Sequence, residues 1–205
     1  MDEPGRPGGR RRPSREELAA ASGRRVPDVI APGLLVLFCG INPSLYSAAV
    51  GHHFARPGNR FWKALHLAGF TPRLLAPEQD GELPAHGLGV TNLVDRATAG
   101  AAEIRPDELR AGAAALAAKV EAAGPAWVAF LGIGAYRVAY DRPGAVVGPR
   151  PDPVAGARVW VLPNPSGLNA HYQLPGLAAA FAALRSAAAG TPTSARPGSR
   201  SGGPA

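Results

Sequence analysis

Two short apolar segments of this chain each lead into an Asn-Pro-Ser tripeptide. The first is Leu34–Cys39, followed by Gly40-Ile41-Asn42-Pro43-Ser44, and the second is Val159–Leu162, followed by Pro163-Asn164-Pro165-Ser166. An apolar run without polar alternation is typical of a buried strand in a parallel sheet. Proline then ends the strand because it has no N–H to give to the ladder. Since ligands of open α/β sheets bind beyond the carboxyl ends of the strands, we expect Asn42 and Asn164 to face one crevice.

Strand-like and helical patterns alternate through the middle of the chain. Apolar runs predict strands at Leu34–Cys39, Leu88–Thr91, Trp127–Leu131 and Val159–Leu162. Apolar residues at helical spacing predict helices at Arg60–Ala68, Pro106–Ala122, Ala135–Tyr140 and Leu174–Ala188. The alternation indicates an α/β fold: a three-layer α/β/α sandwich on a short, mainly parallel four-stranded sheet, formed by one domain over residues 26–188.

The two ends of the chain differ in composition from this middle part. Residues 1–25 hold seven Arg and four acids, and residues 189–205 hold two Arg and no acid. We expect a basic flexible N-terminal tail and a disordered C-terminal tail, with a short helix possible at Ser14–Ser22, where Ser14 and Glu17 form a capping-box pattern. The net charge of +7 is compatible with a polyanion partner. It lies mostly in the ends, and a GC-rich coding sequence explains the excess of Arg equally well.

Several classes of protein are disfavoured by the sequence. No apolar run approaches the ~20 residues that span a membrane, and the N-terminus has no apolar leader. We therefore expect a cytoplasmic protein, nucleoid-associated in a bacterium. The single cysteine, Cys39, is expected to be a small buried apolar residue, since one thiol forms neither an internal disulfide nor a Cys-based metal site. His52 and His53 are adjacent and lack a third ligand at metal-like spacing, so we expect no metal and no cofactor.

Two enzyme signatures are incomplete or missing, and the role of one carboxylate, that of Asp95, is left open between two alternatives. Gly132-Ile133-Gly134 lacks the third glycine of a dinucleotide fingerprint, and the chain has no Gly-x-Ser-x-Gly nucleophile elbow. Asp95 lies near a predicted strand end, where it either pairs with Arg96 or another Arg or takes part in an active site. The loop from Gly51 to Trp62 carries aromatic and hydrogen-bonding side chains, a combination that suits a flat, polar heterocycle.

Three motifs follow one another along the chain: Gly40-Ile41-Asn42-Pro43 with the segment Phe54–Trp62, Gly89-Val90-Thr91-Asn92-Leu93-Val94-Asp95-Arg96, and Leu162-Pro163-Asn164-Pro165-Ser166-Gly167-Leu168. In this order they resemble the motifs of the mismatch-specific uracil/thymine DNA glycosylases of the uracil-DNA glycosylase superfamily. The likeness covers roughly residues 30–185. It implies a uracil-DNA glycosylase-like fold and a monofunctional, cofactor-free enzyme of base excision repair. Such an enzyme excises uracil, or thymine or etheno-cytosine, and acts as a monomer on double-stranded DNA with a G:U or G:T mismatch.

The resemblance also implies roles for single residues. Asn42 matches the catalytic asparagine that positions the attacking water, and Phe54 matches the aromatic ring that stacks on the flipped base. The rest of the base pocket is expected at Ile41, at Ser47, which lies where the pyrimidine C5 face is expected, and at Asn164. Leu168 matches the wedge that fills the vacated stack, and the contact to the unpaired guanine is expected at Ser166, Gly167 and Asn169.

Some residues depart from the family pattern and bear on base preference. Ser44 stands where many relatives have Gly, Tyr46 is bulky for a place so near the pocket, and Asn92 occupies a position that is Lys in some relatives. Asn92 and Asp95 are therefore expected, at most, to contribute to the site in a secondary role. A purely structural role also remains an alternative for the two main candidates. Asn42 could serve merely to cap a turn, and Leu168 could serve merely as a packing residue of the core.

Two other functions remain alternatives at this stage. The first is a non-catalytic or weakly catalytic module that binds uracil or mismatched DNA with the same pocket. The second is a hydrolase of free nucleosides, for which a wedge and basic tails would have no use. Loss of excision with retained mismatch binding would favour the module, whereas Asn42 together with Leu168 favours an enzyme that acts on DNA.

Overall fold

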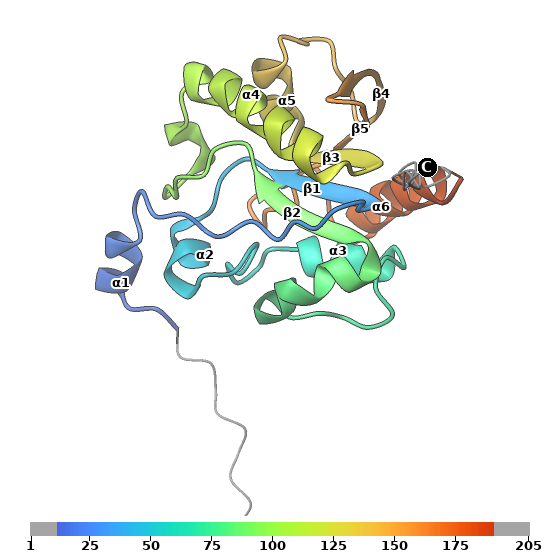
Figure 1. Cartoon of the computed structure of the whole chain (residues 1–205). Coiled ribbons are helices and arrows are strands. Elements are labelled where there is room, and N and C mark those ends of the chain that lie inside the picture. The colour runs from blue at the N-terminus through green and yellow to red at the C-terminus, as the bar shows by residue number, and fades with distance from the viewer. Residues whose placement is uncertain (1–11, 191–205) are drawn as a thin grey trace, which may run out of the picture.

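The computed structural model describes residues 12–190 of the chain, which form one five-stranded sheet with helices on both faces (Figure 1). The strand order is β2-β1-β3-β5-β4. The first four strands in this order are parallel, and β4 runs antiparallel to β5. The strands are β1 Val36–Gly40, β2 Leu88–Asn92, β3 Trp127–Leu131, β4 Gly148–Val154 and β5 Ala157–Leu162. The α/β sandwich expected from the sequence is confirmed, with five strands in place of four.

The fifth strand is β4, which no pattern in the sequence predicts. Its residues Gly148–Val154 include three prolines and are mostly exposed. Proline is tolerated at a sheet edge, where one side of the strand has no ladder to donate to. The strand pairs only with β5, and its register is irregular between Arg150 and Val154. A segment with this composition is typical of a loop, and only the neighbouring strand makes it part of the sheet.

The helices predicted from the sequence are all present, with ends shifted by a few residues. They are α3 Phe61–Leu67, α4 Pro106–Ala123, α5 Ile133–Ala139 and α6 Leu174–Ala189. The structure adds α2 Leu45–Val50 and two 3₁₀ segments, η1 Pro77–His86 and η2 Ala101–Glu103. Among the described residues no helix is long and apolar enough to cross a membrane.

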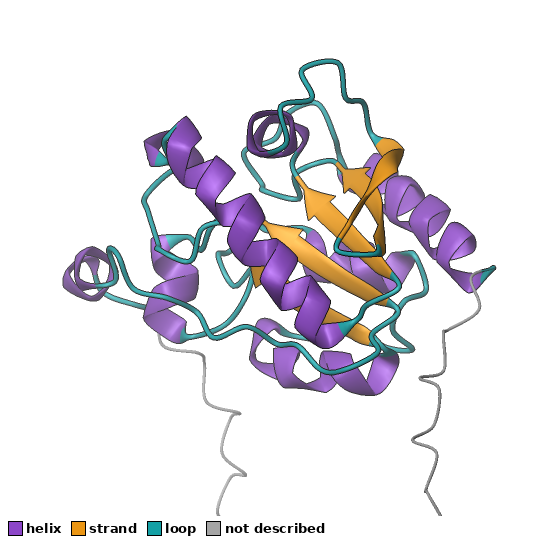
Figure 2. Cartoon of the chain, turned by 45° about the horizontal axis from the view of Figure 1, so that its top comes forward, coloured by secondary structure: helices purple, strands orange, loops and turns teal. Residues whose placement is uncertain are grey.

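Alternate residues of the strands serve two separate cores, one on each face of the sheet, because successive strand side chains point to opposite faces. Val36 and Phe38 pack with residues of α3 and α6, whereas Leu37 and Cys39 pack on the opposite face. That face is covered by α4 and α5, and Figure 2 shows α4 lying across the strands. Cys39 is buried as expected, and burial raises the pKa of its thiol.

Part of the expected flexible N-terminal tail is packed against the domain. Helix α1, Arg15–Ala20, begins at Ser14, and Ser14 and Glu17 form the capping box that the sequence suggests. Ala21 after the helix is fully buried in a small cluster with Val26, with Ala48 of α2 and with Ala97. The structure therefore corrects the assignment of residues 12–25 to the tail. Residues 1–11 and 191–205, which hold the rest of both expected tails, lie outside the described residues.

Candidate active site

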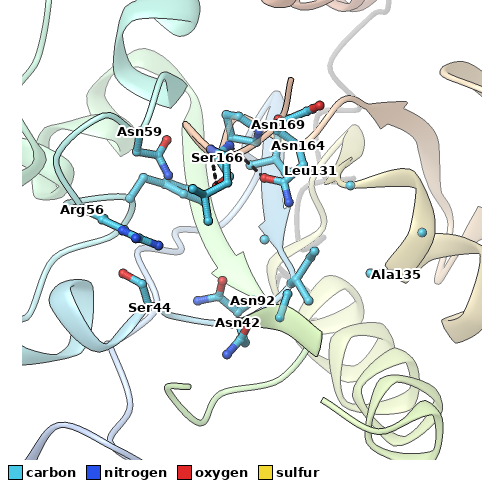
Figure 3. Close-up of a pocket in the computed structure, with 18 of the residues that line it drawn as sticks. Asn42, Ser44, Arg56, Asn59, Asn92, Leu131, Ala135, Asn164, Ser166 and Asn169 are labelled. Atoms are coloured by element: carbon cyan, nitrogen blue, oxygen red, sulfur yellow. Dashed lines mark hydrogen bonds between the residues drawn. The ribbon is translucent and has the colours of Figure 1, made fainter. Parts of the chain in front are cut away.

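The loops at the carboxyl ends of β1, β2, β3 and β5 surround a pocket of about 690 Å³ (Figure 3). The amides of Asn42 and Asn92 lie on one side of it and the segment Asn164–Asn169 on the other. The pocket thus brings together most site residues expected from the sequence: Ile41, Asn42, Ser47, Phe54, Asn92, Asn164, Ser166, Leu168 and Asn169. Gly167 and Asp95 are not among the residues that line it.

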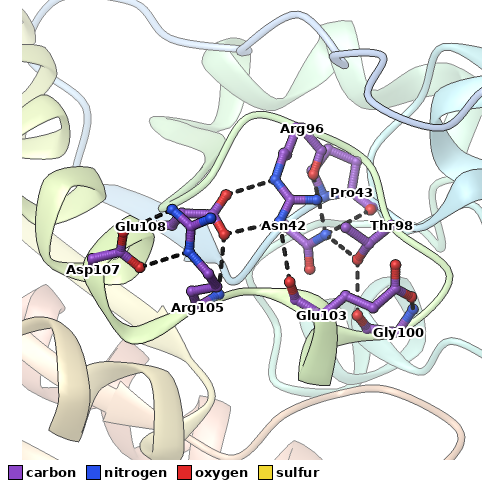
Figure 4. A network of polar contacts seen from close by, with 9 residues as sticks. All are labelled: Asn42, Pro43, Arg96, Thr98, Gly100, Glu103, Arg105, Asp107 and Glu108. Carbon is purple, nitrogen blue, oxygen red and sulfur yellow. Dashed lines mark hydrogen bonds and ion pairs between the residues drawn. The ribbon is translucent and has the colours of Figure 1, made fainter.

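The direction of the Asn42 side-chain amide is fixed by its neighbours. Its Nδ2 donates to the carbonyl oxygens of Pro43 and Arg96, each at 3.1 Å, and to Thr98 Oγ1 at 2.7 Å (Figure 4). A carbonyl oxygen can only accept a hydrogen bond, so the nitrogen of the amide must face these two carbonyls. Among the described residues nothing donates to Asn42 Oδ1, so this oxygen can accept from a molecule in the pocket that Asn42 lines.

The loop that supplies these acceptors is itself anchored to helix α4. Arg96 binds Glu108 with a two-pronged contact, Nε to Oε1 at 2.6 Å and Nη2 to Oε2 at 2.9 Å (Figure 4). These hydrogen bonds lower the pKa of the Glu108 carboxyl to about 2, so the pair stays charged at neutral pH. Thr98 Oγ1 donates in turn to Gly100 O at 2.9 Å, which leaves its lone pairs to Asn42. The arrangement holds the acceptors of the Asn42 amide in place.

Phe54 forms an aromatic platform beside Asn42. One face of its ring stacks on Phe61, with ring centroids 4.2 Å apart, and the side chain lines the pocket. Its φ of 54° lies in the left-handed region, which a bulky residue rarely adopts, so the surrounding structure holds it there. Gly40 is needed next to it, because a Cβ at Gly40 would collide with Asn92 Oδ1 and lie 3.3 Å from the Phe54 ring.

The side chain of Asn92 lines the pocket, and its amide has no hydrogen-bond partner among the described residues. Asn92 ends β2, is 4% exposed and lines the pocket. An amide that lines a pocket without a protein partner can form its hydrogen bonds with a bound molecule. Asn92 therefore offers both a donor and an acceptor to a ligand in the pocket.

His53 is a neutral residue of the pocket wall. It is 2% exposed, and its Nε2 lies 2.9 Å from Pro27 O, which can only accept, so Nε2 carries the proton. Burial lowers the pKa of the imidazole below its ordinary value of 6.5. The neighbouring His52 instead faces Asp80, with Nδ1 3.2 Å from Oδ1. The side chains of the two histidines thus have separate partners, although the backbone N–H of His53 also donates to Asp80. No group of three or more metal-ligating side chains occurs within residues 12–190.

Ser47 forms part of the pocket wall at the start of α2. It is 3% exposed, and its Oγ accepts from the backbone N–H of Ala55 at 3.1 Å. Ser44 caps the helix by accepting from Ser47 N at 3.1 Å, which is the role that the residue type favours at a helix start. The hydroxyl of Ser47 therefore holds the loop that carries Phe54 at a fixed distance from α2.

The segment after β5 makes the other side of the pocket and ends in an exposed leucine. Asn164 Oδ1 accepts from Ser166 N at 2.9 Å, a turn typical of asparagine, and Asn169 Nδ2 donates back to Asn164 O at 2.9 Å. Leu168 at the tip is 78% exposed, so it is no packing residue of the core. Gly167 lies against the neighbouring loop, where a Cβ would meet Gly58 O at 2.6 Å.

Asp95 takes part in an ion-pair network away from the pocket. Lys119 Nζ lies 3.2 Å from Asp95 Oδ1 and 2.8 Å from Asp28 Oδ2, and Arg25 lies 3.8 Å from Asp95 Oδ2. The expected pairing with an arginine is found with Arg25 and not with Arg96, which binds Glu108. The network joins the segment after α1 to α4 and to the end of β2.

Two residues that the structure places in the site have little or no signal in the sequence. Thr98 lies 56 positions from the Asn42 amide that it orients, and no local pattern marks it. His53 belongs to the same loop as Phe54, but its residue type points first to metal binding. The one signal available for it is its place immediately before the aromatic residue of the first motif.

Comparison with known proteins identifies the family. The profile of the Uracil DNA glycosylase superfamily matches residues 27–186, and the chain belongs to that superfamily. A solution NMR structure from Methanosarcina acetivorans, of a protein named as a candidate uracil DNA glycosylase, is similar with a TM-score of 0.52. The likeness covers 80% of this chain and 98% of that one at 20% identity, which shows the shared fold. Membership of the superfamily gives the chain the role of a DNA glycosylase, a hydrolase of N-glycosidic bonds with DNA as its partner.

Proposed function

We propose that this protein is a monofunctional DNA glycosylase that releases uracil paired with guanine, the first step of base excision repair. The observation that carries the proposal is the fixed direction of the Asn42 amide. Two backbone carbonyls and Thr98 hold its nitrogen, so its oxygen is left to accept from a water in the pocket that Asn42 lines. An asparagine that only capped a turn would not need its amide held by a second loop as well.

The reaction needs a positioned water and little base strength. The bond between C1′ of the sugar and N1 of uracil breaks with its electron pair leaving on the base, and the sugar becomes cation-like. The oxygen of a water then bonds to C1′, and its proton passes to solvent or to the departing uracil anion. An amide is a poor base, but a cation-like carbon requires chiefly that the water be held in line. Asn42 Oδ1 is suited to that role.

The pocket offers a stacking surface and edge contacts for a uracil ring. Phe54 presents the ring face that does not stack on Phe61. The unpartnered amide of Asn92 can donate to a carbonyl oxygen of the base and accept from its N–H. A donor aimed at a uracil oxygen is worth most as the base departs, because negative charge then develops there. Ser47 and Ile41 are the further wall residues that we assign to the base.

The exposed leucine beside the pocket supports a duplex substrate. A base must leave the stack to enter such a pocket, at a cost of a few kcal/mol that is smaller at a mismatch. Leu168 is apolar, exposed and next to the pocket mouth, where it can fill the gap as a wedge. We assign the contact with the unpaired guanine to Ser166, Gly167 and Asn169 of the same loop. Since one chain supplies all these groups, we expect a monomer to act on DNA.

Release of bases from defined oligonucleotides tests the proposal. The protein, from an expression host that lacks uracil DNA glycosylases, is incubated in EDTA with G·U, A·U, G·T and G·etheno-cytosine duplexes and with single-stranded uracil DNA. Alkali then cleaves any abasic site. We expect the fastest release from G·U. Binding of G·U without release would indicate the non-catalytic module, and hydrolysis of free uridine alone would indicate a nucleoside hydrolase.

A further inference from the structure

The loop after β5 is folded around a single guanidinium, that of Arg60 at the start of α3. Its terminal amino groups donate to three backbone carbonyls of this loop, those of Ser166, Asn169 (2.9 Å) and Tyr172 (2.7 Å). They also donate to the side-chain oxygen of Gln173 at 3.4 Å. The backbone N–H of Arg60 also donates to Pro165 O at 3.0 Å. Residues more than 100 positions apart in the chain are thereby joined, and the carbonyls converge on one planar group.

Among the described residues, all side-chain hydrogen bonds of Arg60 are made with the loop after β5. Within residues 12–190 no carboxylate forms an ion pair with it, so only carbonyl dipoles and one amide oxygen balance its charge. Its Nε is buried without a hydrogen-bond partner, so the donors used are the two terminal amino groups of the fork. A guanidinium reaches several acceptors at once because its donors are fixed in a plane, which a lysine ammonium cannot imitate.

The loop needs such support because its tip has no packing of its own. Leu168 is 78% exposed, and the loop's internal hydrogen bonds are short-range: Asn169 N to Ser166 O, Leu168 N to Ser166 Oγ and His171 N to Asn169 Oδ1. Bonds of this kind close a turn but do not fix its direction relative to the sheet. Arg60 supplies the long-range connection, together with the close approach of Gly167 to Gly58.

Building on the proposed function, on which it rests, we propose that Arg60 is a positioning residue that holds the Leu168 loop in the conformation that fills the gap left by a flipped base. It acts on the duplex-opening step through Leu168. The pocket groups that break the bond, Asn42 and Phe54, lie on other segments. In the described part of the chain, the hydrogen bonds of Asn42 and the ring stacking of Phe54 do not involve Arg60, so we expect their contribution to remain when Arg60 is changed.

A double-mutant cycle tests this assignment. Single-turnover release of uracil is measured with wild type, Arg60→Lys, Leu168→Ala and the double variant, on a G·U duplex and on single-stranded uracil DNA. We expect Arg60→Lys to lower release from the duplex about tenfold, to spare the single strand, and to add nothing once Leu168 is Ala. Arg73→Lys, which alters an exposed arginine paired with Glu82, is the control without effect. Equal losses on both substrates, or additive losses in the double variant, would overturn the assignment.

A second measurement separates this inference from the proposed function. Hydrogen exchange of the free protein reports the opening of the loop and requires no activity. Arg60→Lys should speed exchange of residues 166–171 about tenfold, with a fall in Tm of no more than a few degrees. Unchanged exchange in that segment would overturn the role of Arg60 even in an active enzyme. Faster exchange in a protein that releases no uracil would uphold the loop contact and reject the proposed function.

Discussion

The side chain of Asn42 has a defined chemical direction only because of what surrounds it. An amide has nearly the same shape with its oxygen and nitrogen exchanged, so the pattern of acceptors decides which end faces the pocket. Here two carbonyls and a hydroxyl, drawn from the residue after Asn42 and from a loop more than 50 positions away, receive the nitrogen. The ability of Asn42 to hold a water therefore depends on Thr98 and on the loop that carries it.

Replacing Thr98 should weaken the chemical step without harming DNA binding. Thr98→Val keeps the shape but removes the acceptor that lies 2.7 Å from Asn42 Nδ2. Since one hydrogen bond contributes about 1 kcal/mol, we predict a loss of roughly fivefold in single-turnover release. Thr98→Ser, which keeps the hydroxyl, should stay near wild type. An equal loss in both variants, or weaker binding of an uncleavable G·U analogue, would contradict this role.

His53 should make the protein less stable in mild acid. Burial lowers the pKa of His53 in the folded state below 6.5, so just below pH 6.5 the unfolded chain binds the proton and the folded protein does not. Stability therefore rises with pH across that range and is lost as the pH falls below 6.5. We predict that His53→Gln, compared by Tm between pH 5 and pH 8, shows a smaller loss of Tm in acid than wild type. Identical profiles would contradict a buried neutral imidazole.

At this scale the sequence predicts which residues meet but not how each is held. Asn42, Phe54 and Asn164 could be placed in one pocket because parallel strands end at the same edge of a sheet. The partner of each side chain depends on contacts distant in sequence, and the separation of 56 positions between Asn42 and Thr98 is an example. Asp95 is an instance of the same difficulty, since its partner Lys119 lies 24 positions away on a different element.

Among the elements, the loop after β5 most clearly separates duplex opening from bond breaking. Its residues Asn164, Ser166 and Asn169 lie on the side of the pocket opposite Asn42 (Figure 3), and its Leu168 is exposed to solvent. A side chain that only fills a vacated stack has no purpose when there is no stack to replace. The loop and the pocket can therefore be tested independently by changing the substrate instead of the protein.

Leu168→Ala should impair release from duplexes more than from single strands. The wedge offsets stacking energy of a few kcal/mol, which uracil in a single strand hardly has. We predict a large deficit on G·U duplex and a small one on single-stranded uracil DNA in single-turnover assays. The Tm should stay near that of wild type, because the side chain is exposed. A deficit of similar size on both substrates would show that Leu168 does not act as a wedge.

The elements that the sequence predicts are those with a strong local signal. Strands β1, β2 and β3 are fully buried and β5 is buried except at Arg158, so their sequences are mostly apolar. Helix α4 carries Pro106 at its start and Gly124 at its end. Strand β4 lacks any such signal because it is exposed and rich in proline. Helix α2 has a signal, Ser44 before it and Gly51 after it. Its six residues are nevertheless easily taken for part of a binding loop.

Over the whole molecule, the positive charge is divided between the folded part and the two ends. Residues 1–11 hold Arg6, Arg10 and Arg11 with two acids, and residues 191–205 hold Arg196 and Arg200 with none. The two ends thus carry +1 and +2 of the net charge of +7. Because α1 packs against the domain, a truncation that tests the basic end should stop before Ser14.

Removing residues 1–11 should reduce DNA affinity without changing the chemistry. Each phosphate contact adds roughly one unit to the slope of log K against log salt, so the slope should fall by up to about three units. The loss should be alike for matched and mismatched duplexes. We predict unchanged single-turnover release at saturating enzyme. A sharp fall of release under that condition would mean that the segment belongs to the active site.

The central claim is that Asn42 holds the attacking water. The most direct measurement is single-turnover release of uracil from a G·U duplex by Asn42→Ala and Asn42→Asp, beside equilibrium binding to an uncleavable analogue. A positioning group that acts as the bond breaks is worth about 3–4 kcal/mol, or ~10²–10³ in rate. We predict a loss of that size for Asn42→Ala with binding retained, and a smaller loss for Asn42→Asp, whose carboxylate can also accept from water. Release by folded Asn42→Ala at nearly the wild-type rate would contradict the claim.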